Sequence, residues 1–176
     1  MFVRLARIGA VWALVVVTVG AWVRLTDAGL GCPDWPGCYG QLVVAGDATG
    51  LADAAAVYPE RPLDPGKAWR EMFHRYLASG LGLLCIALAA VAWRRRHDPG
   101  QPVGLPLLLV VLVVLQGLLG MWTVTLLLKP LIVVAHLLGG LATLAVLFWL
   151  GRWRAVPIPG APGLKRLGLV AAGALG

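Results

Sequence analysis

The sequence predicts an all-α integral membrane protein, a bundle of four transmembrane helices with a long extracytoplasmic loop after the first helix. Hydrophobic residues make up 60% of the 176 residues, charged residues only 13%, and the mean hydropathy is +0.84. Soluble domains have about 25% charged residues. Four apolar runs also reach the ~20 residues that cross a bilayer. The composition argues against a soluble enzyme, a disordered chain and a nucleic-acid-binding protein, and the net charge of +7 is attributed to loops at the membrane surface.

The first apolar run covers about Ile8 to Val23 and follows Arg4 and Arg7. A basic start before an apolar stretch is also typical of a signal peptide. No A-x-A-like cleavage site follows the run, so we expect an uncleaved first span.

Three further spans are predicted at about 69–93, 105–125 and 130–150. Tryptophans lie near the span ends, as in the aromatic belt of a membrane protein. They are Trp69, Trp93, Trp122, Trp149 and Trp153.

The basic residues predict the orientation. Nine of the fifteen Lys and Arg lie in the N-terminus, the 94–104 loop and the 151–166 segment, which we therefore expect in the cytoplasm. The 24–68 loop holds six acidic and three basic residues and is expected in the periplasm. The predicted location is the bacterial inner membrane, with several passes and a cytoplasmic N-terminus.

The C-terminal segment 167–176 is apolar but too short to span a bilayer. We interpret it as the truncated start of a fifth span, after a four-helix unit at 1–166. The chain is accordingly expected to be a fragment of a longer protein.

Two histidines lie within predicted spans, where ionisable groups are costly and therefore indicate function. His74 and His136 are each about five residues from the outer end of their spans, so both rings are expected roughly 7–9 Å below that end. Small residues share their helix faces: Ala78 and Gly82 follow His74, and Gly139, Gly140 and Thr143 follow His136. The pattern favours axial ligation of a haem iron between the helices.

Other interpretations of these histidines remain open. Each imidazole alone would be explained by a hydrogen bond to a neighbouring helix, and small residues also serve helix packing. Zinc is disfavoured because no third or fourth ligand has suitable spacing.

Other polar residues surround this predicted site. Glu71 shares the helix face of His74 and is interpreted either as a proton-transfer group or as an interfacial charge paired with arginine. Arg75 and Arg24 are expected near the outer interface, bound to cofactor carboxylates or extended towards lipid phosphates. Gln116, inside the third span, is expected to form a helix–helix hydrogen bond.

Cys32 and Cys38 lie in the outer loop, separated by two prolines and a glycine that turn the chain. Because that compartment is oxidising in bacteria, we expect a disulfide. Its role is either to fasten the loop over the bundle or, as an exposed bridge, to exchange electrons or thiols.

These motifs resemble the N-terminal half of the haem A synthase family. The match covers residues 20 to about 150 and has three segments: 20–38, the Glu-x-x-His-Arg signature at 71–75, and 115–120 followed by Lys129, Pro130 and His136. The resemblance implies an oxidoreductase of cytochrome oxidase assembly that oxidises a methyl substituent of haem O to a formyl group. Successive hydroxylations would produce haem A.

The resemblance also implies site residues. It makes His74 and His136 the haem-facing ligands, Glu71 an acid needed for activity, and Cys32 and Cys38 the loop cysteines of one subclass. Family members usually have eight spans in two halves, so a second histidine pair with haem b is expected in the missing half. Whether this chain is active alone stays open.

Haem O, the lipid bilayer and an unidentified electron donor are the implied partners, with haem O synthase as a further candidate. The missing half or a second copy of the chain would complete the assembly.

Two rival functions share some of these features. A membrane cytochrome with two histidine ligands would transfer electrons without needing Glu71. A quinone-linked disulfide oxidoreductase would use the loop cysteines but leave the histidines unexplained. A structural membrane subunit would need neither group.

Overall fold

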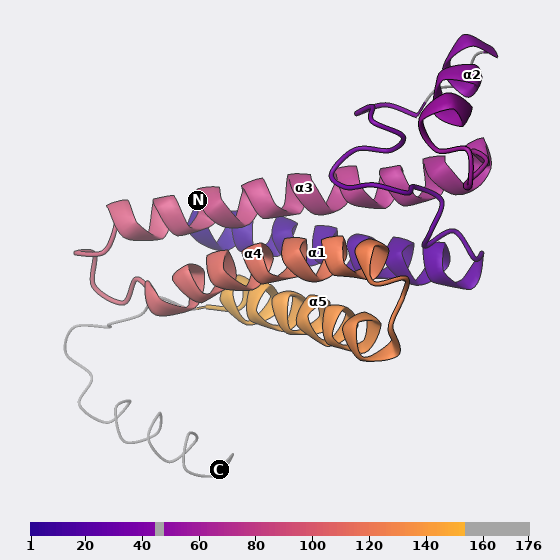
Figure 1. Ribbon diagram of the computed structural model, residues 1–176. Helices are drawn as coiled ribbons and strands as arrows, with labels where there is room; N and C mark the ends of the chain where they lie inside the picture. Colours follow the sequence, from indigo (N-terminus) through magenta and orange to yellow (C-terminus); the bar gives the residue numbers. More distant parts are fainter. Residues whose placement is uncertain (45–47, 154–176) are drawn as a thin grey trace.

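The structure is a computed structural model and describes residues 1–44 and 48–153. The described part is helical, without strands, and four of its helices are long and apolar enough to cross a membrane. This confirms the predicted all-α membrane bundle (Figure 1). The elements are α1 (Phe2–Leu25), α2 (Ala48–Val57), α3 (Pro65–Arg94), α4 (Gly104–Thr125) and α5 (Pro130–Gly151). The expected fifth span at 167–176 lies outside the described residues.

Helices α1 and α3 extend beyond the predicted apolar spans, because polar groups at their ends also adopt helical structure, whereas α4 and α5 match their predicted spans to within one residue. Helix α3 begins at Pro65, whose fixed φ suits the first helical position. Asp64 precedes it and accepts a hydrogen bond from the backbone N–H of Lys67 at 3.0 Å, which caps the helix. Helix α1 includes Arg7, whose Nε donates to the carbonyl of Gly151 at 2.8 Å and so ties α1 to the end of α5.

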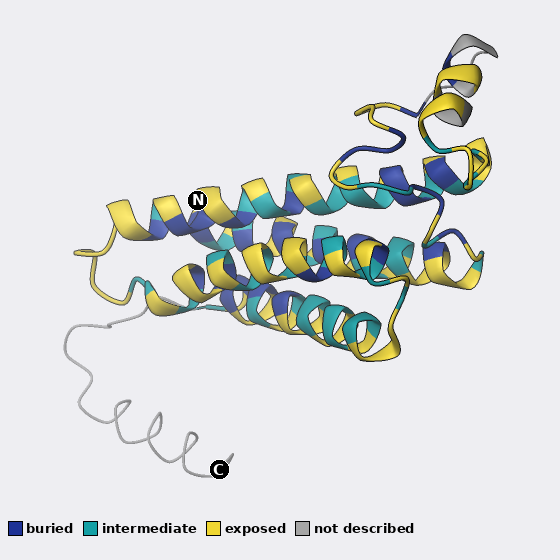
Figure 2. Ribbon diagram, in the orientation of Figure 1, coloured by how far each residue is buried: buried dark blue, intermediate teal, exposed yellow. Residues whose placement is uncertain are grey.

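The four spanning helices form a ring. Helix α1 packs against α3 and α5, and α4 packs against the same two, so α3 and α5 lie diagonally across the bundle. The inner face is lined by small and aliphatic side chains, while much of the apolar outer surface is exposed (Figure 2), as a lipid environment requires. The buried centre of this core includes Ala6, Ala13, Leu81, Cys85, Leu88, Leu109, Leu147 and Leu150.

The two ends of the bundle differ. The long loop with α2 lies at the end where α1 finishes and α3 begins, together with the turn from α4 to α5 (Figure 1). The N-terminus, the α3–α4 connection and the end of α5 lie at the other end. Within the described residues, the basic N-terminus and the 94–104 loop therefore lie at the opposite end from the acidic loop, as the predicted orientation requires; the orientation itself stays a prediction.

Candidate functional site

The structure brings the two intramembrane histidines together at the centre of the ring. His74 comes from α3 and His136 from α5, the diagonal pair of helices. Their ring centroids are 6.5 Å apart, and the ring planes are nearly perpendicular at 85°. Because diagonal helices do not pack against each other, these imidazoles meet across the interior of the bundle.

Unpaired polar atoms gather in the same region. Among the described residues, three buried side-chain atoms lack a hydrogen-bond partner: Nδ1 of His74, Nδ1 of His136 and Oε1 of Gln116. The Gln116 Nε2 donates to the carbonyl of His136 at 2.7 Å, which confirms the expected helix–helix hydrogen bond. An unsatisfied buried polar atom costs about 1–3 kcal/mol. Three together indicate a place where a ligand would supply the missing partners.

Two glycines from the other helices lie beside the imidazoles. A Cβ at Gly20 of α1 would lie 2.8 Å from Cε1 of His74, and one at Gly120 of α4 would lie 3.5 Å from Cε1 of His136. All four spanning helices therefore contribute to the histidine pair.

Two of the small residues that share the helix faces of the histidines differ in what surrounds them. A Cβ at Gly139 would lie 2.5 Å from Oε1 of Gln116, so this glycine makes room for an amide. Gly82 would have nothing within 4 Å of an added Cβ. The helical spacing identified residues on the face of each histidine but not the neighbouring helix that each one contacts.

The two histidines fit a metal whose remaining ligands come from a macrocycle and not from the protein. In the described ranges, no group of three or more His, Cys, Asp and Glu could hold a metal ion. A protein zinc site needs at least three such ligands, whereas haem iron needs only axial ligands from the protein. Two facing imidazoles with unpaired Nδ1 atoms are compatible with that second arrangement.

Glu71 and Arg75 form a clamp between α3 and the outer loop. Glu71 is only 5% exposed. Its Oε2 accepts from the backbone N–H of Cys32 at 2.9 Å, and its Oε1 accepts from Nη2 of Arg75 at 2.5 Å. Nη1 of Arg75 donates to the carbonyls of Asp34 at 3.0 Å and Gly37 at 2.5 Å. Both terminal nitrogens of Arg75 are thus engaged by the protein itself.

The disulfide between Cys32 and Cys38 is present, as predicted. The two cysteines are 0% and 2% exposed, so the bridge is buried and not exposed as the thiol-exchange interpretation supposed. The side chain of Asp34 accepts from the backbone N–H groups of Tyr39 at 2.7 Å and Gly40 at 2.8 Å, which fixes the turn that follows. This bonding favours the role of fastening the loop over the bundle.

The remaining charges at this end are at the surface. Arg24 is exposed in the last turn of α1. Lys67 binds Asp27 at 2.8 Å and holds the pKa of that carboxyl below its usual value through the hydrogen bond and its charge. Burial raises the pKa of Tyr39, whose hydroxyl donates to the carbonyl of Arg61 at 3.1 Å.

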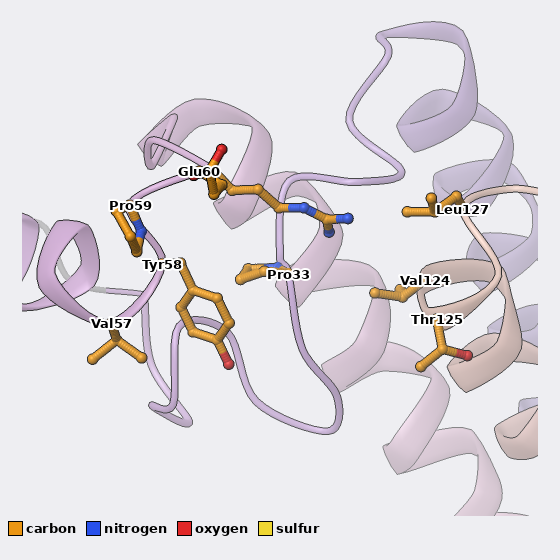
Figure 3. Close-up of a pocket in the computed structure, with 9 residues that line it drawn as sticks. Pro33, Val57, Tyr58, Pro59, Glu60, Val124, Thr125 and Leu127 are labelled. Carbon is orange, nitrogen blue, oxygen red and sulfur yellow. The ribbon is translucent and has the colours of Figure 1, made fainter.

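A cavity of about 400 Å³ lies between the outer loop and the end of α4 (Figure 3). Pro33, which follows Cys32, forms part of its wall, and Val124 and Leu127 face it from the other side. Sequence reasoning missed this cavity, because residues of the loop and of α4 far apart in the chain enclose it. The complete lining is Pro33, Val57, Tyr58, Pro59, Glu60, Arg61, Val124, Thr125 and Leu127.

Comparison with known proteins agrees with the sequence motifs. The sequence model of the COX15-CtaA family, described as cytochrome oxidase assembly protein, matches residues 3–176. The chain belongs to the COX15-CtaA family. The match confirms the resemblance to the N-terminal part of haem A synthases. Together with the four apolar helices, it makes the chain a multi-pass bacterial membrane protein.

Relatives within the family carry the name haem A synthase. The Shewanella oneidensis protein is 47% identical over 146 residues, covering 83% of this chain and 43% of the relative. The Shouchella clausii protein is 33% identical over 66% of this chain and 34% of the relative. The Hyphomonas neptunium protein is 30% identical over 80% of this chain and 46% of the relative. The chain thus spans less than half the length of these relatives, and no solved structure matches it.

Proposed function

We propose that this chain forms a haem-binding part of a haem A synthase, which oxidises a methyl substituent of haem O to a formyl group. Two successive hydroxylations, which would need an oxygen source and an electron partner from outside this chain, would convert the methyl carbon to a geminal diol, and loss of water would give the aldehyde. The observation that carries the proposal is the facing pair of His74 and His136, with their unpaired buried Nδ1 atoms, in a chain related to haem A synthases.

The separation of the imidazoles supports ligation of one iron. Metal–nitrogen bonds of about 2 Å on each side of a metal ion place two imidazole centroids about 6 Å apart. The observed centroid separation is 6.5 Å. We therefore propose His74 and His136 as the residues that would hold the iron. The bound macrocycle supplies the iron and the methyl group to be oxidised, and the four helices orient it and exclude water.

Glu71 is proposed to serve this site from the outer side. It lies one turn outward of His74 on α3, and its carboxylate is shielded from water. Such a group is suited to moving a proton or stabilising positive charge near the macrocycle. Its bonds to Cys32 and Arg75 also give it a structural role, which a substitution can separate from the chemical one.

Arg75 and Arg24 were both expected to bind cofactor carboxylates. Arg75 donates to Glu71 and to loop carbonyls, so we propose that it orients Glu71 and the loop. Arg24 remains a candidate for contact with a cofactor carboxylate at the membrane surface.

The proposed setting of the reaction rests on the family and on the charges of the loops. We propose an inner-membrane location with the disulfide loop in the periplasm. Haem O would be the substrate, with an electron donor and haem O synthase as partners. The rest of the full-length protein or a second copy would contribute the haem b site.

The test is to extract and separate the haems of cells that are supplied with haem O. The cells would express the 176-residue chain alone or fused to the remaining part of the Shewanella oneidensis relative. We expect haem A or its hydroxylated precursor with the intact histidines, and neither with His74→Ala or His136→Ala. If every sample contains haem b and no oxidised haem O, the synthase proposal is wrong and an electron-transfer cytochrome takes its place.

Glu71→Gln in the same fusion separates the two roles of that residue. Glutamine still accepts a hydrogen bond from the Cys32 N–H but has no carboxylate. Loss of oxidised haem with an unchanged haem spectrum would support the chemical role. Unchanged product would leave Glu71 as an anchor of the loop.

A further inference from the structure

The cavity described above lies closer to the loop end of the bundle than the histidine pair does. Gly120 of α4 lies beside His136, and Val124 lies one turn further along the same face, about 6 Å outward. On the other side, His74 is followed outward by Glu71, which binds Cys32, and Pro33 next to Cys32 lines the cavity. Residues on α4 and residues bonded to α3 thus both connect the surroundings of the imidazoles with the wall of the cavity.

The cavity contains one cationic side chain among the lining residues that the structure describes, that of Arg61. No hydrogen bond or ion pair of its guanidinium is present within the described ranges. Two other cations at this end are already engaged: Arg75 binds Glu71 and the loop, and Lys67 binds Asp27. The carboxylate of Glu60 also lines the cavity, but it points away from Val124 and Leu127 (Figure 3).

An iron porphyrin bound at the histidines needs a polar place for its two propionates. Ionised carboxylates are strongly disfavoured in hydrocarbon, so they extend to the nearer end of the bundle. His136 is about 9 Å from the loop end of α5 and about 22 Å from the other end, at 1.5 Å per residue. The nearer end is the one that holds the cavity.

We propose that Arg61 binds a propionate of the macrocycle held by His74 and His136, and that the cavity receives the propionate edge. This rests on the proposed function, since it assumes a porphyrin at the histidines. A guanidinium suits a carboxylate because it donates two parallel hydrogen bonds. The cavity volume, near the lower end of the ~300–1,000 Å³ range of ligand sites, suits one edge of a porphyrin.

The experiment compares iron protoporphyrin IX with its dimethyl ester, which lacks both negative charges. The 176-residue chain in nanodiscs of zwitterionic lipid is titrated with each, and binding is followed by the Soret absorbance that His74→Ala abolishes. Arg61→Gln is expected to raise the Kd of the free acid about tenfold and to leave the Kd of the ester unchanged. Arg61→Lys is expected to recover part of the loss. The matched control is Arg70→Gln, because Arg70 lies over the ring of Trp22 at the same end of the bundle and does not line the cavity.

Each outcome has a distinct meaning. Ester binding by Arg61→Gln shows that the variant folds, so an unchanged Kd for the free acid overturns the role of Arg61. A loss of equal size for acid and ester also overturns it. If the Arg61→Gln effect appears only when anionic phospholipid is added, the residue binds a lipid phosphate instead. Absence of any His74-dependent spectrum in the unaltered chain contradicts the proposed function itself.

Discussion

Arg75 and Arg61 lie at the same end of the bundle but differ in what surrounds their charges. Arg75 is held by Glu71 and by loop carbonyls, so its charge is used to build the protein. Arg61 lines a cavity without such partners in the described ranges. Arg75 therefore positions other groups of the protein, whereas the guanidinium of Arg61 is the one proposed to bind a ligand.

Gly20 provides a test of the histidine site. A Cβ added there would lie 2.8 Å from Cε1 of His74, so Gly20→Ala must displace the imidazole. We expect haem binding at least about tenfold weaker, equivalent to about 1.4 kcal/mol. The measurement is a Soret titration of the purified chain.

Gly117→Ala is the control for this change, because nothing lies within 4 Å of the added Cβ. It should bind haem like the unaltered chain. Equal haem affinities of the Gly20→Ala and Gly117→Ala variants would show that haem binding does not require His74 in its observed position.

At the scale of helices, one aromatic side chain of α1 is bonded to the backbone of α3. The indole Nε1 of Trp12 donates to the carbonyl of Leu77 at 3.1 Å, which holds the ring against α3. The ring then occupies the space beside Gly80, where a Cβ would lie 2.7 Å from Cζ2.

Gly80→Val is therefore expected to force α1 and α3 apart. Overpacking of this kind costs about 1–3 kcal/mol, and we expect a Tm lower by several degrees in detergent. Circular dichroism on heating measures it. Gly82→Ala on the same helix should leave the Tm within a degree or two, since its Cβ would meet no atom within 4 Å. Equal Tm values for both variants would contradict the observed helix contact.

The four spanning helices were predictable from the sequence, because crossing a bilayer requires long apolar runs. A span needs an apolar run of fixed length, and this requirement located all four. It located the ends of α4 and α5 to within one residue, but not the start of α3, because Asp64 and Pro65 start that helix by capping and not by hydrophobicity. Helix α2 was missed, although its alanines have high helix propensity.

The candidate site was predictable only along each helix. Depth within a span placed His74 and His136 at one level, and the structure brings them together. The spacing of residues along each helix did not predict contacts between segments that are distant in the sequence. Examples are the bond from Cys32 to Glu71 and the approach of Gly20 to His74.

At the scale of the whole molecule, the ends of the bundle differ in charge, and this predicts how it lies in the membrane. We expect Asp53→Cys, in the loop helix α2, to react with a membrane-impermeant maleimide in intact spheroplasts. Arg96→Cys, in the α3–α4 connection, should react only after permeabilisation. Both residues are exposed, so access depends on the side of the membrane.

The unaltered chain is the control, because Cys85 is buried and the other two cysteines form the disulfide. It should remain unlabelled in both conditions. Labelling of Arg96→Cys in intact spheroplasts, with Asp53→Cys protected, would reverse the predicted orientation.

The crossing of the outer loop over α3 restricts how this sequence is able to change during evolution. A Cβ at Gly31 would lie 2.6 Å from the backbone carbon of Lys67 and 2.8 Å from the backbone nitrogen of Ala68. Backbone atoms within a helix have no rotamer that moves them aside. Any other residue at this position would lift the loop, and with it the Cys32 N–H that Glu71 binds. Relatives that retain the clamp should therefore retain a glycine here, however far the rest of the loop diverges.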